Sequence, residues 1–261
     1  MRILLHVVAA AVAAALIAQS GAATPIGNPT KWSQLPDMLH GLNYSSENKV
    51  PSLVADDWLC QSIYPVTDIH WWGTYWRPSK PVPPGGAPNS DSLPSQVPGG
   101  IAAFSFVIWT DIPAGFEGEP FSHPGGALWE FRVPYELANE VFVGTVPDKQ
   151  DVYQYFIRLP EEKWFHQEPG TIYWLSIRAV WSEPYSEWPY KQWGWHESLL
   201  SEHWNDSAVQ DFKNSGWYAL NKDGISTDMA FELTCIPEPS SLLAFASGLT
   251  GLVGLLIRRR R

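Results

Sequence analysis

Short runs in which apolar and polar side chains alternate with a period of two constrain the fold of this chain more than any other feature. In the run from residue 66 to 76, alternation places Ile69, Trp71 and Tyr75 on one face of a strand. Similar runs, rich in aromatic and β-branched residues, occupy residues 104–109, 153–159, 173–177 and 229–235. No helical pattern of comparable strength separates them. We therefore predict an all-β fold, a single β-sandwich of jelly-roll type.

Two segments of this body depart from the strand pattern. Within residues 197–210 we expect a turn or two of helix. Residues 77–100 contain seven prolines and four glycines, which cannot lie in the interior of a sheet. A linker at that point would leave the first piece with too few strands to stand alone, so we interpret this segment as a long surface loop within one domain.

The amino terminus has the features of an export signal. Arg2 precedes an apolar run from Ile3 to Ile17, and small residues follow at positions 21–23. This order is typical of a secretory signal peptide, so we expect the Sec export machinery to recognise it and signal peptidase to cleave after Ala23, or alternatively after Ser20. The other interpretation, a permanent amino-terminal anchor, is weaker because the run is short of the ~20 residues that span a membrane.

Three elements follow one another at the carboxyl terminus. The first is the tripeptide Pro237, Glu238 and Pro239, the second an apolar stretch from Leu242 to Ile257, and the third the cluster Arg258, Arg259, Arg260 and Arg261. The prolines keep the tripeptide extended, and the arginines are expected to hold the end in the cytoplasm. As a transmembrane helix the stretch spans about 24 Å, a little short of a ~30 Å hydrocarbon core, and Ser240, Ser241 and local thinning of the bilayer can make up the difference. Hydropathy alone leaves open an ordinary anchor that is never cut.

This tail resembles the PEP-CTERM sorting signal of Gram-negative and related bacteria. The resemblance implies processing by exosortase, a membrane-embedded cysteine protease and transpeptidase, at the motif formed by Pro237, Glu238 and Pro239. We accordingly divide the chain into a signal peptide (1–23), a β-sandwich ectodomain (24–236) and a sorting signal (237–261). The ectodomain carries 12 basic and 26 acidic residues, a net charge of −14, which argues against nucleic acid as a partner.

The body is also similar to an uncharacterised ectodomain found in proteins with this tail. The similarity runs through residues 32–38, 55–60, 66–75, 111–115, 203–206 and 228–231. It implies a shared fold and export, and it assigns no activity to any residue.

Cys60 and Cys235 are the only cysteines, and export takes them to an oxidising compartment. Alternation points both side chains inward, so they form either a disulfide or two buried free thiols. The disulfide, which we favour, would close a loop of 175 residues and stabilise the fold by at most about 5 kcal/mol in the chain-entropy model.

Tryptophan offers the most plausible ligand site. Trp71 and Trp72 are adjacent in a strand and cannot both face one core. Exposed indole rings stack on sugars, so Trp72, Trp76, Trp193 and Trp195 are candidates for glycan binding. The alternative is that these rings serve packing alone.

Evidence for catalysis is weaker. His196 and His203 with Asp206 form a poor metal motif, because the zincin spacing of two histidines is missing. We expect no metal site, no cofactor and no catalytic residues, and we keep a polysaccharide hydrolase with paired carboxylates as a minor alternative. The leading hypothesis is a non-enzymatic protein of the cell surface or extracellular matrix, held briefly in the inner membrane, processed by exosortase and delivered to extracellular polysaccharide.

Overall fold

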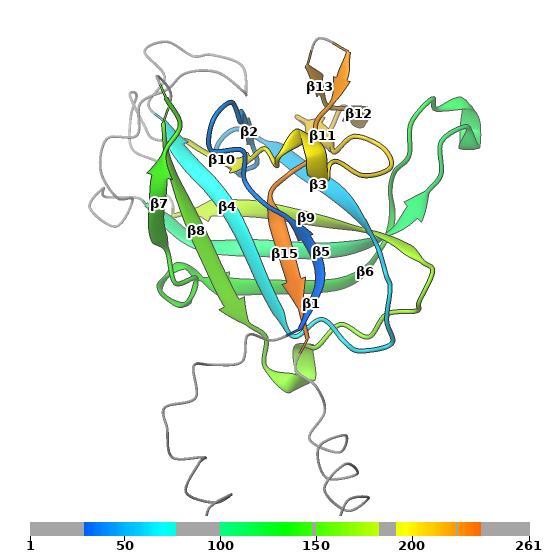
Figure 1. The fold of residues 1–261 in the computed structure, drawn as a ribbon, viewed down its shortest axis with the longest axis horizontal. Coiled ribbons are helices and arrows are strands. Elements are labelled where there is room, and N and C mark those ends of the chain that lie inside the picture. Colours follow the sequence, from blue (N-terminus) through cyan, green and yellow to red (C-terminus); the bar gives the residue numbers. More distant parts are fainter. Residues whose placement is uncertain (1–28, 77–99, 148–149, 183–191, 223, 236–261) are drawn as a thin grey trace, which may run out of the picture.

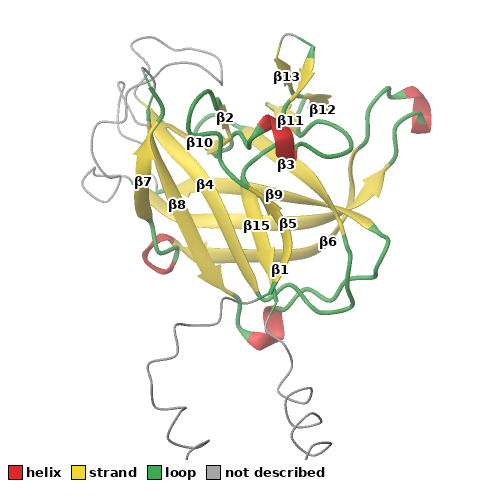
Figure 2. Ribbon diagram, viewed as in Figure 1, coloured by secondary structure: helices red, strands yellow, loops and turns green. Residues whose placement is uncertain are grey.

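The protein folds into strands with only short helical turns between them (Figures 1 and 2). The computed structural model describes residues 29–76, 100–147, 150–182, 192–222 and 224–235. The predicted signal peptide, the predicted sorting signal and nearly all of the predicted loop at 77–100 therefore lie outside the described residues. The strands are β1 (Thr30–Gln34), β2 (Asn43–Ser45), β3 (Ser52–Leu59), β4 (Asp68–Trp76), β5 (Ile101–Ile112), β6 (His123–Pro134), β7 (Val141–Thr145), β8 (Asp151–Arg158), β9 (Ile172–Trp181), β10 (Gln192–His196), β11 (Val209–Phe212), β12 (Trp217–Ala219), β13 (Asn221–Lys222), β14 (Ile225–Ser226) and β15 (Phe231–Thr234). The 3₁₀ turns are η3 (Phe116–Gly118), η4 (Tyr135–Leu137), η5 (Glu161–Lys163) and η6 (Leu200–Glu202).

Two antiparallel sheets make up most of the structure. In the seven-stranded sheet, β4 pairs with β8 along one edge, while β15 and β10 share its other edge. β1 extends this sheet beside β15, β2 beside β10 and β7 beside β8. The second sheet has the order β12-β11-β3-β9-β5-β6, and β13 and β14 form a separate hairpin.

The two sheets pack face to face through aromatic side chains. The ring of Trp71 on β4 lies edge-on to Phe104 and Phe106 on β5, with centroid distances of 5.2 and 4.9 Å. On its own sheet it stacks on Tyr155, 5.2 Å away. Ile69, Trp71 and Tyr75 all belong to this main core, as alternation along β4 predicts. The all-β architecture is confirmed, and the jelly-roll order of the strands stays a prediction.

Position 73 shows how tightly this core is packed. The indole of Trp193, on β10, lies against Gly73 of β4, and a Cβ atom at Gly73 would stand only 2.5 Å from Cζ2 of that ring. Trp72 faces the other way, into a small outer cluster with Val146, Val152 and Ala230. The prediction that Trp71 and Trp72 cannot share a face is therefore confirmed.

The turn or two of helix predicted within residues 197–210 is limited to a single 3₁₀ turn. Only the 3₁₀ turn η6 and the beginning of β11 occur in that segment. Its backbone is bonded to distant parts of the chain, with Leu199 donating to the Leu35 carbonyl at 2.8 Å and Ala208 to the Thr227 carbonyl at 2.9 Å. These bonds use N–H groups that a helix would direct along its own axis.

Both ends of the described body meet at one place. Thr30, where β1 begins, is the register partner of Thr234, where β15 ends. In Figure 1 this point lies at the lower end of the sandwich, whereas the β13 and β14 hairpin lies at the upper end. The amino-terminal segment and the sorting signal are therefore attached side by side at one end of the body.

Candidate functional site

A turn before β2 and the residue that follows β10 bring acidic side chains to one surface pocket. Asp37 N–H donates to the Glu197 carbonyl at 3.0 Å, and Glu197 N–H donates to the Leu42 carbonyl at 2.9 Å. Asp37 Oδ1 accepts from the N–H groups of Leu39 and His40, each at 2.9 Å, which fixes the turn. The two segments, about 160 residues apart in sequence, are thus held together mainly by backbone hydrogen bonds.

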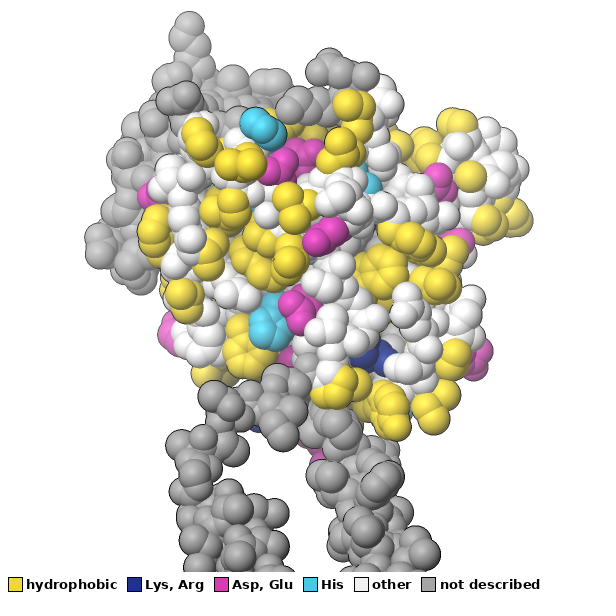
Figure 3. All heavy atoms as spheres, in the orientation of Figure 1, with side chains coloured by type: hydrophobic (Ala, Val, Ile, Leu, Met, Phe, Trp, Pro, Cys, Tyr) yellow, Lys and Arg dark blue, Asp and Glu magenta, His cyan; other side chains and the backbone are white. Residues whose placement is uncertain are grey.

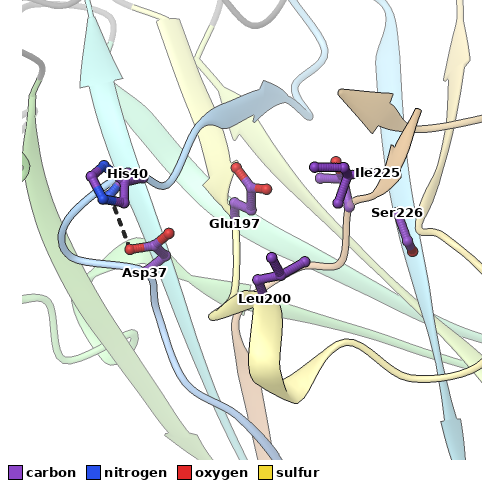
Figure 4. A pocket seen from close by; sticks show the side chains of 7 residues that line it. Asp37, His40, Glu197, Leu200, Ile225 and Ser226 are labelled. Atoms are coloured by element: carbon purple, nitrogen blue, oxygen red, sulfur yellow. Dashed lines mark hydrogen bonds between the residues drawn. The ribbon is translucent and has the colours of Figure 1, made fainter. Parts of the chain in front are cut away.

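The pocket between them has a volume of about 210 Å³. Figure 4 shows Asp37 and His40 on one side, Glu197 in the middle, and Leu200 and Ile225 on the other sides. Ser226 and Thr227 complete the lining. Leu200 and Ile225 are apolar yet 60% and 51% exposed, so the cavity combines carboxylates with accessible aliphatic surface.

The pocket itself is negatively charged. Partial burial acts to raise the pKa of Asp37, but the N–H groups of His40 and Leu39 and the nearby imidazoles of His40 and His196 outweigh it and lower the pKa. Asp37 is therefore ionised at neutral pH. No lysine or arginine is among the lining residues. Figure 3 likewise shows acidic side chains, a histidine and apolar side chains together near the upper end of this face.

The tryptophans predicted to bind glycans do not present free ring faces. Trp193 and Trp195 are fully buried and Trp72 is 5% exposed. Trp193 Nε1 donates to the Tyr155 hydroxyl at 3.2 Å, and Trp195 Nε1 donates to the Ala230 carbonyl at 2.8 Å. The predicted exposure of these three rings is wrong. Trp193 and Trp195 point into the core between the two sheets, and Trp72 packs into the outer cluster with Val146, Val152 and Ala230. The side chain of Trp76 lies outside the described residues.

The two cysteines are buried and occur here as separate thiols. Cys60 Sγ donates to the Ser62 carbonyl at 3.2 Å, and Cys235 Sγ approaches the Pro29 carbonyl at 3.6 Å. Burial lowers the pKa of the Lys31 ammonium, whereas charge on either cysteine would raise it. Cys60 and Cys235 therefore both lie near Lys31. The inward orientation is confirmed, and the disulfide stays a prediction.

The weak metal motif is not assembled. The ring nitrogens of His196 bond to Asn43 Oδ1 at 2.7 Å and to the Asp37 carbonyl at 3.1 Å. His203 Nε2 instead bonds to the Ser198 carbonyl at 3.3 Å, and Asp206 accepts from the Ser122 N–H. Over the parts of the chain that the structure describes, no three His, Cys, Asp or Glu side chains are placed so that they could hold a metal ion.

A group of buried acids is a feature that sequence reasoning missed. Asp56, Asp57 and Asp228 are all fully buried. Asp56 Oδ2 accepts from the Met229 N–H and Asp228 Oδ2 from the Trp204 N–H, both at 2.7 Å. Burial is the main cause that raises the pKa of all three, to about 8 for Asp57 and about 6 for Asp228. The signal in the sequence was two adjacent acids inside an otherwise apolar strand.

Asp56 and Asp57 diverge, because neighbouring side chains in a strand point to opposite faces. Asp56 bonds to Met229 next to β15, whereas Asp57 Oδ2 accepts from Asn205 Nδ2 at 2.7 Å. Asp57 also lies near Asp111 and Asp206, whose charges raise its pKa further. Because these acids are enclosed and hydrogen-bonded, we interpret them as structural groups.

The sorting motif and the arginine cluster lie outside the described residues. Among the residues described, no helix is both long and apolar enough to cross a membrane. The membrane helix predicted at 242–257 falls beyond that range.

Comparison with known proteins finds two separate matches in the chain. Residues 236–261 match the PEP-CTERM protein-sorting motif, which implies export, membrane-associated sorting in Gram-negative bacteria and exosortase as the processing partner. No curated protein and no solved structure matches the chain. Residues 30–234 match the model of the domain of unknown function DUF7901, and they coincide with the span from β1 to β15. The chain therefore belongs to the DUF7901 family and carries a PEP-CTERM sorting motif behind that domain.

Proposed function

We propose that this protein is a non-catalytic component of the cell surface or extracellular matrix, exported through its signal peptide and released from a temporary membrane anchor by exosortase. The observation that carries the proposal is the pairing of Thr30 with Thr234 directly before the sorting motif. Because both terminal segments leave the body at one end, a membrane-held precursor can present the opposite end of the sandwich outward. Removal of either segment leaves the paired strands β1 and β15 intact.

The absence of catalysis is supported by the position of the reactive groups. A catalytic side chain has to touch its substrate, yet Asp56 and Asp57, whose pKa values are raised, have no exposed surface. Cys60 and Cys235 are buried as well. The exposed part of the described surface instead carries an acidic pocket and half-buried aromatic rings, which suit binding.

The sorting step is tested by replacing Glu238 with alanine in the full-length protein in its own host. Loss of the acid from the proline-flanked motif should prevent recognition, so the uncut form should accumulate in the membrane fraction. Glu232, on β15 and outside the motif, provides the matched control: Glu232→Gln should be processed normally. Equal processing of wild type and Glu238→Ala would refute the exosortase step.

A second candidate function is carbohydrate binding, at a different place from the one expected. Trp109 and Trp217 are partly buried on the outer face of the six-stranded sheet, with ring centroids 6.4 Å apart. Asp111, whose carboxylate accepts from Trp174 Nε1, lies on the same sheet. Indole rings beside hydrogen-bonding groups suit a sugar ligand.

A glycan array probed with the full-length protein in a detergent without a sugar headgroup tests this candidate. Binding that weakens in Trp217→Ala and persists in Trp32→Ala would support it, because Trp32 is a partly buried ring on β1 of the other sheet. Absence of any sugar-dependent signal would leave a structural role.

A further inference from the structure

The pocket formed by Asp37, His40 and Glu197 is suited to a particular class of ligand. Two carboxylates approach it from segments distant in sequence, and the lining contains neither lysine nor arginine. Its accessible charge is therefore negative, and the ionised Asp37 keeps it so at neutral pH. A ligand that enters has to compensate this charge and donate hydrogen bonds.

The opposite side of the pocket is apolar and suits an aliphatic group. Leu200 and Ile225 are large apolar side chains that remain 60% and 51% exposed. Isolated exposed aliphatic side chains are common, but two that border one cavity together offer a contact surface for a hydrocarbon stem. The volume of about 210 Å³ is below the 300–1,000 Å³ typical of drug-sized ligands, so the occupant is small or is the end of one side chain.

We propose that this pocket binds a primary ammonium group carried on a short aliphatic chain, as in a lysine side chain or a small alkylamine. The ammonium donates hydrogen bonds toward Asp37 and Glu197, and the stem packs on Leu200 and Ile225. A metal ion fits less well, because no three His, Cys, Asp or Glu side chains among the described residues, Asp37, His40 and Glu197 included, are placed so that they could hold one. A neutral sugar fits less well, because no aromatic ring lines the cavity. The proposal stands independently of exosortase processing.

Calorimetric titration of the full-length protein in nonionic detergent tests it with two matched probes. Nα-acetyl-lysine methylamide keeps the side-chain ammonium, whereas Nα-acetyl-norleucine methylamide has a similar stem without it. We expect only the lysine probe to bind, with an affinity that falls as NaCl is raised. Butylammonium should compete with it, and glucosamine, which lacks an aliphatic stem, should not. Equal affinity for both probes, or affinity independent of NaCl, would overturn the proposal.

Variants locate the site. Glu197→Gln should raise the Kd of the lysine probe about tenfold or more, because the amide retains an acceptor for the Leu42 N–H and removes the charge. Leu200→Ser should weaken binding of the lysine probe without restoring binding of norleucine. Glu161→Gln, an exposed acid in η5, is the control and should leave the Kd unchanged. If Glu197→Gln unfolds, Leu200→Ser decides, and binding unaffected by both changes places the ligand elsewhere and refutes this site.

Discussion

Replacement of Asp57 by asparagine should stabilise the protein at neutral pH and weaken the pH dependence of its stability. Asp57 is fully buried on β3; its Oδ2 accepts from Asn205 and its Oδ1 has no partner. Burial is the main cause that raises its pKa from 3.8 to about 8, and the charges of Asp228, Asp111 and Asp206 add to it. The folded protein therefore holds a proton at neutral pH that the unfolded chain has released.

The sign and size of the effect follow from this difference in bound protons. Between about pH 4 and pH 8 the folded carboxyl is protonated and the unfolded one ionised, so the free energy of unfolding falls as pH rises, by about 1.4 kcal/mol per pH unit. Below this window both states are protonated and the penalty disappears. At pH 7 it amounts to at most about 4 kcal/mol. Asparagine keeps the acceptor for Asn205 but adds an N–H group that needs a partner, so we expect a net gain of about 1–3 kcal/mol.

Urea unfolding of the full-length protein in nonionic detergent, followed by tryptophan fluorescence from pH 5 to pH 8, measures the effect. The plot of unfolding free energy against pH should be less steep for Asp57→Asn than for wild type by about 1.4 kcal/mol per unit. Glu130→Gln, an exposed acid on β6 of the same sheet, is the control and should follow wild type. Parallel plots for Asp57→Asn and wild type would refute the view that Asp57 is protonated in the folded protein.

Three further predictions concern packing and covalent structure. Gly73→Ala should destabilise the fold by about 1–3 kcal/mol in the same urea assay, because the new methyl group meets the buried ring of Trp193; an unchanged midpoint would contradict the packing described. Tyr75→Phe should cost about 1–3 kcal/mol, because the Tyr155 hydroxyl, which donates to Tyr75 at 2.7 Å, loses its acceptor; a loss below 0.5 kcal/mol would show that water replaces it. The protein isolated from its host should gain two mass units on reduction if Cys60 and Cys235 are bonded, and a mass that reduction leaves unchanged would exclude the disulfide.

Strand periodicity gave the architecture and the faces of the strands. Alternation in β4 correctly separated Ile69, Trp71 and Tyr75 from Trp72, because side chains in a strand point to opposite faces whatever surrounds it. Periodicity does not say whether the second face is covered. Trp193 and Trp195 were expected to be exposed, but they point into the core between the two sheets, and Trp72 on the outer face is covered by a second cluster.

The pocket and the buried acids depend on contacts that no local pattern reveals. Asp37 and Glu197 lie about 160 residues apart and meet through backbone hydrogen bonds. Likewise, the segment after Glu197 has a composition that permits a helix, but the strands around it offer its N–H groups other acceptors. Tertiary pairing overrides local propensity at such positions. The sorting tail could be predicted because its three elements are adjacent in sequence and act without a folded context.

The central claim, that this chain is an exported protein released by exosortase, is tested most directly by mass spectrometry of the protein recovered from its own host. The account predicts an extracellular or surface fraction in which the polypeptide begins after Ala23, or after Ser20, and has lost the arginine cluster at 258–261. Recovery of the protein from the cytosol with both ends intact would contradict it.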